Sequence, residues 1–204
     1  MTEEKKEKGG SKSGWIIVAV LIAIFALPEI IAVSLQAMKW RPDSTTNRGE
    51  LVQPARPIRE TTLTTLENKS IKFSDLKGKW TMVHFSDAAC NETCIKNLYF
   101  MRQVKTALGK EQERVQRVFV LLSETERAVL EDKIKDYPGM TVIVGTRENI
   151  QELAGQFAVQ AATTADPNRI YLVDPLGNLM MTYIDNPSGM IKDLTHLMKT
   201  SWSG

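Results

Sequence analysis

Cysteine and histidine are both scarce in this sequence of 204 residues, which contains only Cys90, Cys94, His84 and His196. Two cysteines cannot form the disulfide framework of a domain this large, and a structural zinc site usually takes four Cys or His ligands. Strong charge is also lacking: the formal net charge is +2, and no basic stripe with interleaved aromatic residues is present. These absences argue against a nucleic-acid-binding protein and exclude an imidazole-rich metal site.

Motifs of the common enzyme classes are missing as well. The sequence contains no glycine-rich phosphate-binding loop, no Ser/His/Asp arrangement and no zinc-hydrolase motif. The hydrophobic content of 43% and the charged content of 25% are nevertheless ordinary for a folded protein. Function therefore has to be sought in the cysteine pair and in the organisation of the chain.

One long apolar run, residues 15–39, predicts a transmembrane anchor. Trp15 and Trp40 bound it as an aromatic belt would, and a helix of this length spans roughly 35 Å. A cleavable signal peptide is the alternative, but its apolar region would be shorter and would end in a small-x-small site. An uncleaved single-pass anchor is therefore favoured.

Pro28 and Glu29 interrupt this apolar run. Proline removes a helical hydrogen bond, and a carboxylate in the membrane is costly, so Glu29 indicates a partner helix or a polar cavity. The alternative is that Glu29 is protonated or reaches a nearer interface. Basic residues flank the run on both sides and weakly favour a cytoplasmic N-terminus: Lys5, Lys6, Lys8 and Lys12 before it, and Lys39, Arg41 and Arg48 after it.

The rest of the chain divides into three further parts. Residues 1–14 are polar and rich in Gly, Ser and Lys, which predicts a disordered tail. Residues 40–60 carry three prolines without periodicity, which predicts an extended linker. From residue 61 to 204 the pattern becomes that of a globular domain.

Short β-prone runs alternate with helical spacing in this domain, which predicts a layered α/β fold. The expected strands are a pair around Asn68 and Lys69, three buried strands over 79–85, 117–122 and 140–145, and a hairpin at 170–184; the expected helices cover 91–108, 124–137, 147–159 and 188–200.

Cys90 and Cys94 lie in the expected loop between the strand at 79–85 and the helix at 91–108. At a helix N-terminus the dipole favours a thiolate at Cys90, and Cys94 lies one turn later on the same face. Their Cα atoms would be about 6 Å apart, which permits a disulfide, and two facing thiolates would also suit Cu(I). A static disulfide, a redox pair and a metal pair all remain open, although so short a loop would gain little from a purely structural bridge.

At this point the chain resembles the SCO/SenC family of cytochrome oxidase copper-assembly proteins, which have a thioredoxin-like fold. The resemblance rests on the membrane anchor, the linker and the order strand–CxxxC–helix. Four further features of the sequence support it: FSDLKGKW, Leu98 with Met101 in the helix, VIVGTRENIQELAGQFAV, and YLVDPLGNL at 171–179. It implies a thioredoxin-like domain over 61–204 and Cys90 and Cys94 as a copper-binding thiol pair.

Three positions depart from the family pattern. The family motif is Cys-Pro-x-x-Cys-Pro, but Asn91 and Ile95 stand at the proline positions. The family's third copper ligand is a histidine shortly before Tyr-Leu-Val-Asp-Pro, and Asp166 falls at or near that position. Since Asp is a hard oxygen ligand, it suits Cu(I) poorly. His84, on the strand before the pair, is a candidate replacement, although a strand histidine is more often packed or surface-facing.

The resemblance implies a membrane-anchored accessory factor for cytochrome c oxidase copper-centre assembly, with copper held by Cys90 and Cys94 and with an oxidase subunit or other copper-assembly factors as partners. One alternative is a thiol–disulfide reductase that keeps a partner's copper-ligand cysteines reduced, with the same pair as its catalytic residues. Another is a non-catalytic docking scaffold with a decayed copper site. The family and the weak charge bias together predict an inner-membrane anchor with the C-terminal domain in the periplasm.

Overall fold

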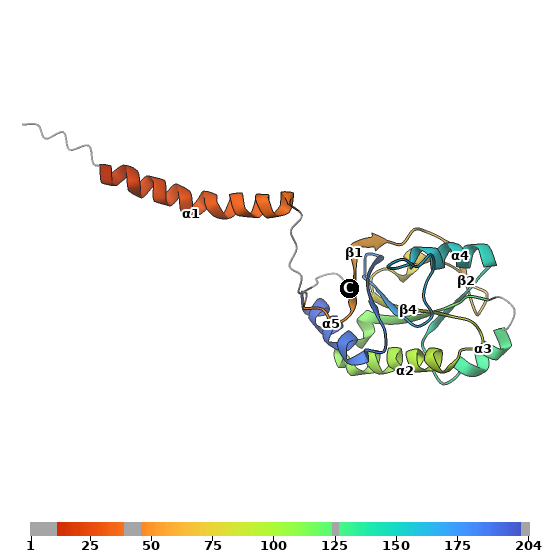
Figure 1. The fold of residues 1–204 in the computed structure, drawn as a ribbon. Helices are drawn as coiled ribbons and strands as arrows, with labels where there is room; N and C mark the ends of the chain where they lie inside the picture. The colour runs from red at the N-terminus through yellow and green to blue at the C-terminus, as the bar shows by residue number, and fades with distance from the viewer. Residues whose placement is uncertain (1–11, 39–45, 124–126, 201–204) are drawn as a thin grey trace, which may run out of the picture. The chain divides into compact units, whose positions relative to one another are not determined.

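The computed structural model describes residues 12–38, 46–123 and 127–200, and the chain separates into two units, Met1–Thr46 and Asn47–Gly204. Figure 1 shows both units as ribbons. The sequence predicts a disordered tail over residues 1–14; residues 1–11 lie outside the described residues, and the prediction is wrong for residues 12–14, which are helical. Residues 39–45 of the predicted anchor and linker also lie outside the described residues.

Unit 1 is described as a single helix, α1 (Lys12–Ala37), which contains Pro28. Its segment Gly14–Ala37 has a mean hydropathy of 2.9 and is long and apolar enough to cross a membrane. Apolar residues surround the helix on all sides rather than on one stripe, so it does not have the pattern of a helix packed on a soluble core. This helix fits a single-pass membrane anchor.

Unit 2 is built on one mixed sheet of eight strands in the order β1-β8-β7-β4-β5-β6-β2-β3. Strands β4, β5 and β6 run parallel, and every other neighbouring pair is antiparallel. The strand bounds are β1 (Glu50–Pro57), β2 (Thr62–Thr65), β3 (Ser70–Lys72), β4 (Trp80–Ser86), β5 (Val115–Leu121), β6 (Thr141–Val144), β7 (Ile170–Val173) and β8 (Asn178–Tyr183). The predicted α/β fold, strand pair and hairpin are confirmed.

Helices cover both faces of this sheet (Figure 1). Their bounds are α2 (Glu92–Ala107), α3 (Arg127–Ile134), α4 (Arg147–Gln156) and α5 (Pro187–Thr200), with 3-10 turns at η1 (Phe73–Leu76) and η2 (Gly109–Arg114). On one face, η1 and α4 pack against the side chains of Val83 and Phe85. On the other, α2 and α5 cover Trp80 and Met82, and α2 with α3 covers Phe119. Strand β4 is therefore buried along its whole length, and its C-terminal end leads into the cysteine loop.

The linker predicted over residues 40–60 is wrong in its second half, because Glu50–Pro57 forms strand β1 at the edge of the sheet. It pairs with β8, and the register shifts between Leu51 and Arg56. An edge strand needs hydrogen-bond partners on one side only, so it tolerates the prolines that argued against a strand here.

A buried carboxylate fastens the start of unit 2 to its last helix. Asp193 on α5 is 7% exposed. It accepts hydrogen bonds from the backbone N–H groups of Arg48 (2.9 Å) and Gly49 (2.9 Å) and from the Tyr183 hydroxyl (3.0 Å). A Cβ on Gly49 would lie 2.5 Å from the Tyr183 ring, so only glycine fits there. Burial raises the pKa of the Tyr183 hydroxyl, which keeps it a donor to Asp193. We call Arg48, Gly49, Tyr183 and Asp193 the entry clasp.

Candidate functional site

The cysteine pair lies where the sequence predicts it, between the end of β4 at Ser86 and the start of α2 at Glu92. Cys90 and Cys94 form a disulfide, and their Cα atoms are 5.0 Å apart, closer than the expected 6 Å. The structure therefore shows the oxidised form of the pair. Reduction would leave two thiols within one turn of helix.

Two side chains fix the backbone that carries these cysteines. The Asp87 carboxylate accepts the Cys90 N–H at 3.1 Å, and the Asn91 side chain accepts the Cys94 N–H at 3.0 Å as the N-cap of α2. Cys90 itself has a φ of 37°, in the left-handed region that residues other than glycine rarely adopt. Asn91 thus supplies, at a position where the family motif has proline, a capping acceptor that proline does not possess.

Both cysteines are buried, with 2% of Cys90 and 1% of Cys94 exposed. They belong to a cluster formed with apolar residues of α2, α3, β5 and β6: Leu98, Leu130, Phe119, Leu121, Val142 and Val144. Because the sulfur atoms are covered, a metal ion or a second thiol can reach them only when the surrounding side chains move. The apolar surroundings would then strengthen any charge-based interaction made there.

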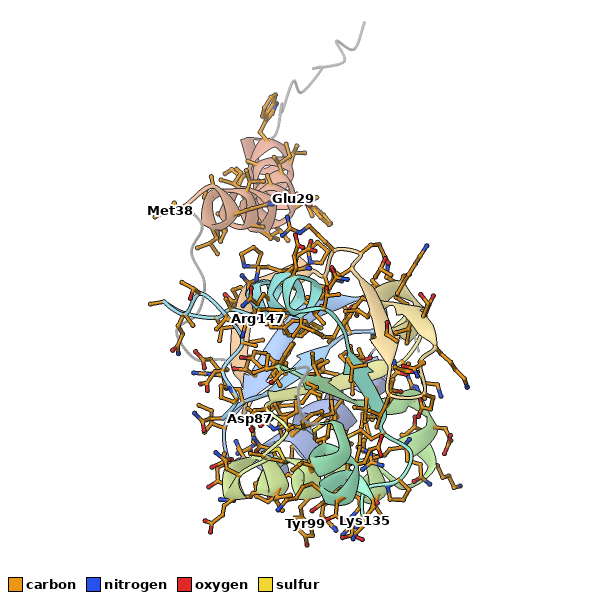
Figure 2. All side chains as sticks on the ribbon, turned by 90° about the vertical axis from the view of Figure 1, so that its right-hand side faces the viewer. Glu29, Met38, Asp87, Tyr99, Lys135 and Arg147 are labelled. Atoms are coloured by element: carbon orange, nitrogen blue, oxygen red, sulfur yellow. A yellow bond between two sulfur atoms is a disulfide. The ribbon has the colours of Figure 1, made fainter. Side chains whose placement is uncertain are left out.

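A shallow groove of about 610 Å³ lies beside the disulfide, between α2 and the end of α3. Cys90 lines it and Cys94 does not; the other lining residues are Ala89, Asn91, Glu92, Ile95, Lys96, Tyr99, Lys133 and Tyr137. Tyr99 is 45% exposed and is labelled at the edge of the domain in Figure 2. The Arg102 guanidinium lies 5.6 Å from the Tyr99 ring and 5.3 Å from the Tyr137 ring, which holds both rings in place. A molecule in the groove would therefore meet residue Cys90 before Cys94.

His84 is fully buried on β4, against the ring of Phe119 in the cysteine cluster at a centroid distance of 5.9 Å. Its Nδ1 lies 3.1 Å from the Arg169 carbonyl oxygen. A carbonyl can only accept, so Nδ1 carries the proton and Nε2 of the neutral ring keeps its lone pair. Nε2 is buried without a hydrogen-bond partner among the residues that the structure describes. Burial lowers the pKa of His84 from 6.5 to about 4, although the Arg169 carbonyl opposes this shift.

This depressed pKa predicts that the metal-free protein loses stability in mild acid. As the pH falls from 6.5 towards about 4, the unfolded chain binds a proton at His84 and the folded chain does not. The free energy of unfolding should therefore decrease by roughly 3 kcal/mol over this window. Urea unfolding at a series of pH values measures the change. His84→Phe is the control, because it keeps a ring against Phe119 and should flatten the dependence; an equally steep dependence in this variant would assign it to other groups.

The Asp166 side chain, near the position of the family's histidine, makes hydrogen bonds within the turn before β7. Its carboxylate accepts hydrogen bonds from the Asn168 N–H at 2.9 Å and from Arg169 Nε at 3.3 Å, and so closes the turn before β7. Arg169 also pairs with Glu50 of β1 and donates to Thr182 at 2.8 Å. The Arg169 guanidinium lowers the pKa of Glu50. This network joins the turn to the edge of the sheet.

The described residues contain no group of three His, Cys, Asp or Glu side chains placed to hold a metal ion. The structure brings Cys90 and Cys94 together and leaves His84 outside such a group, so His84 as a ligand stays a prediction. His196 is exposed on α5. Sequence reasoning missed the roles of Asp87 and Asn91 and the groove beside Cys90. Asn91 could have been recognised, because Asn directly before a helical pattern is a common N-cap.

Comparisons with known proteins agree with this description. A family model described as "Transmembrane-like, thioredoxin-like, C-terminal domain" matches residues 80–201. A curated relative, the mitochondrial protein SCO2 of Saccharomyces cerevisiae, is 24% identical over 140 residues, which cover 64% of this chain and 44% of that protein. The chain thus spans less than half the length of this relative.

Solved structures share the fold at low sequence identity. Yeast Sco1 with copper bound matches with a TM-score of 0.62 and 17% identity, covering 74% of this chain and 96% of that one. The thioredoxin domain of a thiol-disulfide oxidoreductase from Bacteroides vulgatus matches with a TM-score of 0.54 and 17% identity, covering 69% of this chain and 94% of that one. The thioredoxin-like fold and the resemblance to the SCO/SenC proteins, both predicted from the sequence, are confirmed.

Proposed function

Because the chain belongs to the transmembrane-like, thioredoxin-like C-terminal domain family and resembles SCO proteins, we propose that it is a membrane-anchored accessory factor for cytochrome c oxidase copper-centre assembly. The observation that carries the proposal is the pairing of its only two cysteines at the N-terminus of α2. In this function the reduced pair binds Cu(I) and passes it to an oxidase subunit or to another assembly factor. Support also comes from the fold shared with yeast Sco1, whose structure has copper bound.

The chemistry of the pair suits Cu(I) as cargo. Two thiolates are soft ligands, and binding one Cu(I) would release the two thiol protons. The disulfide form has no thiolate to offer, so an external thiol reductant must first deliver two electrons and two protons to the pair. His84 is the candidate third ligand, since its Nε2 has a free lone pair in the layer next to the cysteine cluster.

Copper titration of the full chain tests the proposal. The chain in detergent, reduced and then freed of reductant, should take one equivalent of Cu(I) from a colorimetric chelator, and the oxidised chain should take none. His84→Phe should weaken retention by about 10-fold or more if the imidazole is a ligand, since losing even an outer-shell partner of a metal site costs about 10- to 100-fold. A reduced chain that cannot compete with the chelator would rule out copper carriage.

A second function, thiol–disulfide reduction of a partner, is favoured by the groove that Cys90 alone of the pair lines. The Cys90 thiolate would attack a partner disulfide, form a mixed disulfide and release one partner thiolate. The Cys94 thiolate would then attack Cys90 Sγ, release the second partner thiolate and leave the Cys90–Cys94 disulfide of this structure. The disulfide of this structure is the form that such a reaction would leave.

This order of attack predicts different behaviour of the two single variants. Cys94→Ser should accumulate mixed disulfides, because Cys90 can attack but nothing resolves the intermediate. Cys90→Ser should accumulate few, because Cys94 does not line the groove. Non-reducing electrophoresis of membranes after acid quenching measures the adducts. Equal trapping by both variants would contradict the assignment of Cys90 as the entry sulfur.

We further propose that α1 lies in the inner membrane with the C-terminal domain in the periplasm. The basic residues before α1 and the SCO/SenC resemblance support this orientation. Alkaline phosphatase fused after Gly204 should be active if the domain is periplasmic, since that enzyme needs disulfides that form only there. An inactive fusion with an active cytoplasmic reporter at the same place would reverse the orientation.

A further inference from the structure

Glu29 lies inside the part of α1 that can cross a membrane. It is preceded by Pro28 and stands about 12 Å along the helix from Ala37, so its short side chain cannot reach the membrane surface at that end. No hydrogen bond or ion pair links Glu29 to any other residue of the described chain. Since Gly14–Ala37 is apolar enough to insert with leucine at this position, anchoring alone does not explain a carboxylate there.

Two other polar side chains, Ser34 and Gln36, lie in this span. The Ser34 hydroxyl donates to the Ile30 carbonyl of its own helix at 2.7 Å, so its polarity is satisfied within α1. Gln36 follows Glu29 by seven residues and therefore lies on the same face, with Ala32 between them and Ala26 one turn earlier. Small residues beside a polar one allow two helices to approach closely in a membrane. We call Ala26, Glu29, Ala32 and Gln36 the acidic face of α1; Figure 2 labels Glu29 on this helix.

We propose that the acidic face docks a membrane-spanning helix of another protein, which carries a lysine or arginine at the depth of Glu29. The inference assumes that α1 spans a membrane, as the proposed function requires. Charge complementarity selects this occupant: a cationic side chain neutralises Glu29 where no water can do so, and Gln36 offers a further hydrogen bond along the same face. A second copy of this chain is disfavoured, because a symmetric pair would bring two Glu29 carboxylates together.

Pro28 adds a second reason for a partner at this depth. Its ring nitrogen has no hydrogen, so the Ile24 carbonyl one turn earlier lacks its helical donor. In the hydrocarbon region an unsatisfied carbonyl is costly. A lysine or arginine side chain on a neighbouring helix has several N–H donors, so it can donate hydrogen bonds both to the carboxylate and to nearby carbonyls. The Ile24 carbonyl and the Glu29 carboxylate therefore both need hydrogen-bond donors from outside α1.

The test uses the full chain, fluorescently labelled, in phosphatidylcholine vesicles. The probes are two synthetic Leu/Ala helices that differ only in a single central Lys or Leu, and energy transfer reports their association with α1. The Lys helix should bind the wild-type chain about 5- to 30-fold more tightly than the Leu helix, the range that one interhelical polar contact gives. Glu29→Leu should abolish the preference, and Glu29→Gln should keep only a part of it.

Ser34→Ala is the matched control, because that hydroxyl is satisfied within α1 and its loss should leave the preference unchanged. Equal binding of the two helices by the wild-type chain, or a preference that survives Glu29→Leu, would overturn the proposal. Energy transfer between copies of the chain without any probe, lost in Glu29→Leu, would replace it by a homodimer. Alkaline extraction is measured in parallel: a wild-type chain that is extracted from vesicles would disprove the membrane anchor itself, whereas a retained chain confines a negative result to the docking face.

Discussion

If the proposed copper carriage is right, replacing both cysteines, Cys90→Ser with Cys94→Ser, should eliminate Cu(I) binding and the assembly of the oxidase copper centre while the domain stays folded. Serine hydroxyls are hard and neutral at pH 7, so the affinity should fall by well over about 100-fold, the upper loss seen when only an outer-shell partner is removed. The disulfide closes a very short loop, and its removal should cost only about 2 kcal/mol of unfolding free energy. Chelator competition and the copper content of the oxidase measure the two effects.

The control is an Asn91→Ala variant, which removes the N-cap of α2 but keeps both thiols. It should lose about 1 kcal/mol of stability and retain stoichiometric Cu(I) binding. Full copper loading of the oxidase by the double serine variant would contradict both the carrier and the reductase. The protein would then act as a docking scaffold whose thiol pair is dispensable.

Replacing Asp193 with alanine should destabilise unit 2 by about 3 kcal/mol or more. The carboxylate of the entry clasp is buried and accepts hydrogen bonds from two backbone N–H groups and the Tyr183 hydroxyl. Alanine would leave these donors buried without an acceptor, and each unsatisfied group costs about 1–3 kcal/mol. Urea unfolding of the full chain in detergent, followed by circular dichroism, measures the loss.

Two comparisons make this prediction specific. Tyr183→Phe removes one of the three donors to Asp193, together with a weak contact to the Met181 sulfur at 3.5 Å, so it should cost only about 1 kcal/mol. Asp132→Ala, on helix α3, removes an exposed ion pair with Lys135 at 2.8 Å and should cost well under about 1 kcal/mol. Equal losses in Asp193→Ala and Asp132→Ala would show that the clasp does not stabilise the domain. Proteolysis near Arg48 should also become faster in Asp193→Ala alone.

Much of the fold could be predicted because local sequence patterns match the buried elements. Strand β4 is apolar on both faces and α2 repeats apolar residues at helical spacing, so each carries its own signal. Strand β1 carries no such signal: it is largely exposed and contains Pro54 and Pro57. It is held by pairing with β8, more than a hundred residues later, and by the ion pair of Glu50 with Arg169. Contacts between positions so far apart leave no local periodicity to detect.

The location of the candidate site could be predicted from the sequence, but its surroundings could not. A strand-to-helix turn places Cys90 and Cys94 together by local geometry, and the sequence shows that turn. Their burial, the groove beside Cys90 and the contact of His84 with the Arg169 carbonyl depend on how α3 and the turn before β7 pack. Those packings arise from side chains of separate elements, so the pattern around the cysteines cannot reveal them.

If α1 spans a membrane, as proposed, the entry clasp also sets an upper limit on the distance between that membrane and the start of unit 2. Because Arg48 and Gly49 are fastened to α5, the chain joining α1 to the domain runs only from Ala37 to Asn47. Even fully extended, this segment cannot exceed about 35 Å, roughly half the length of a linker that ended at residue 60. Under the proposed function, a recipient site would have to lie within that distance of the end of α1 for the domain to reach it.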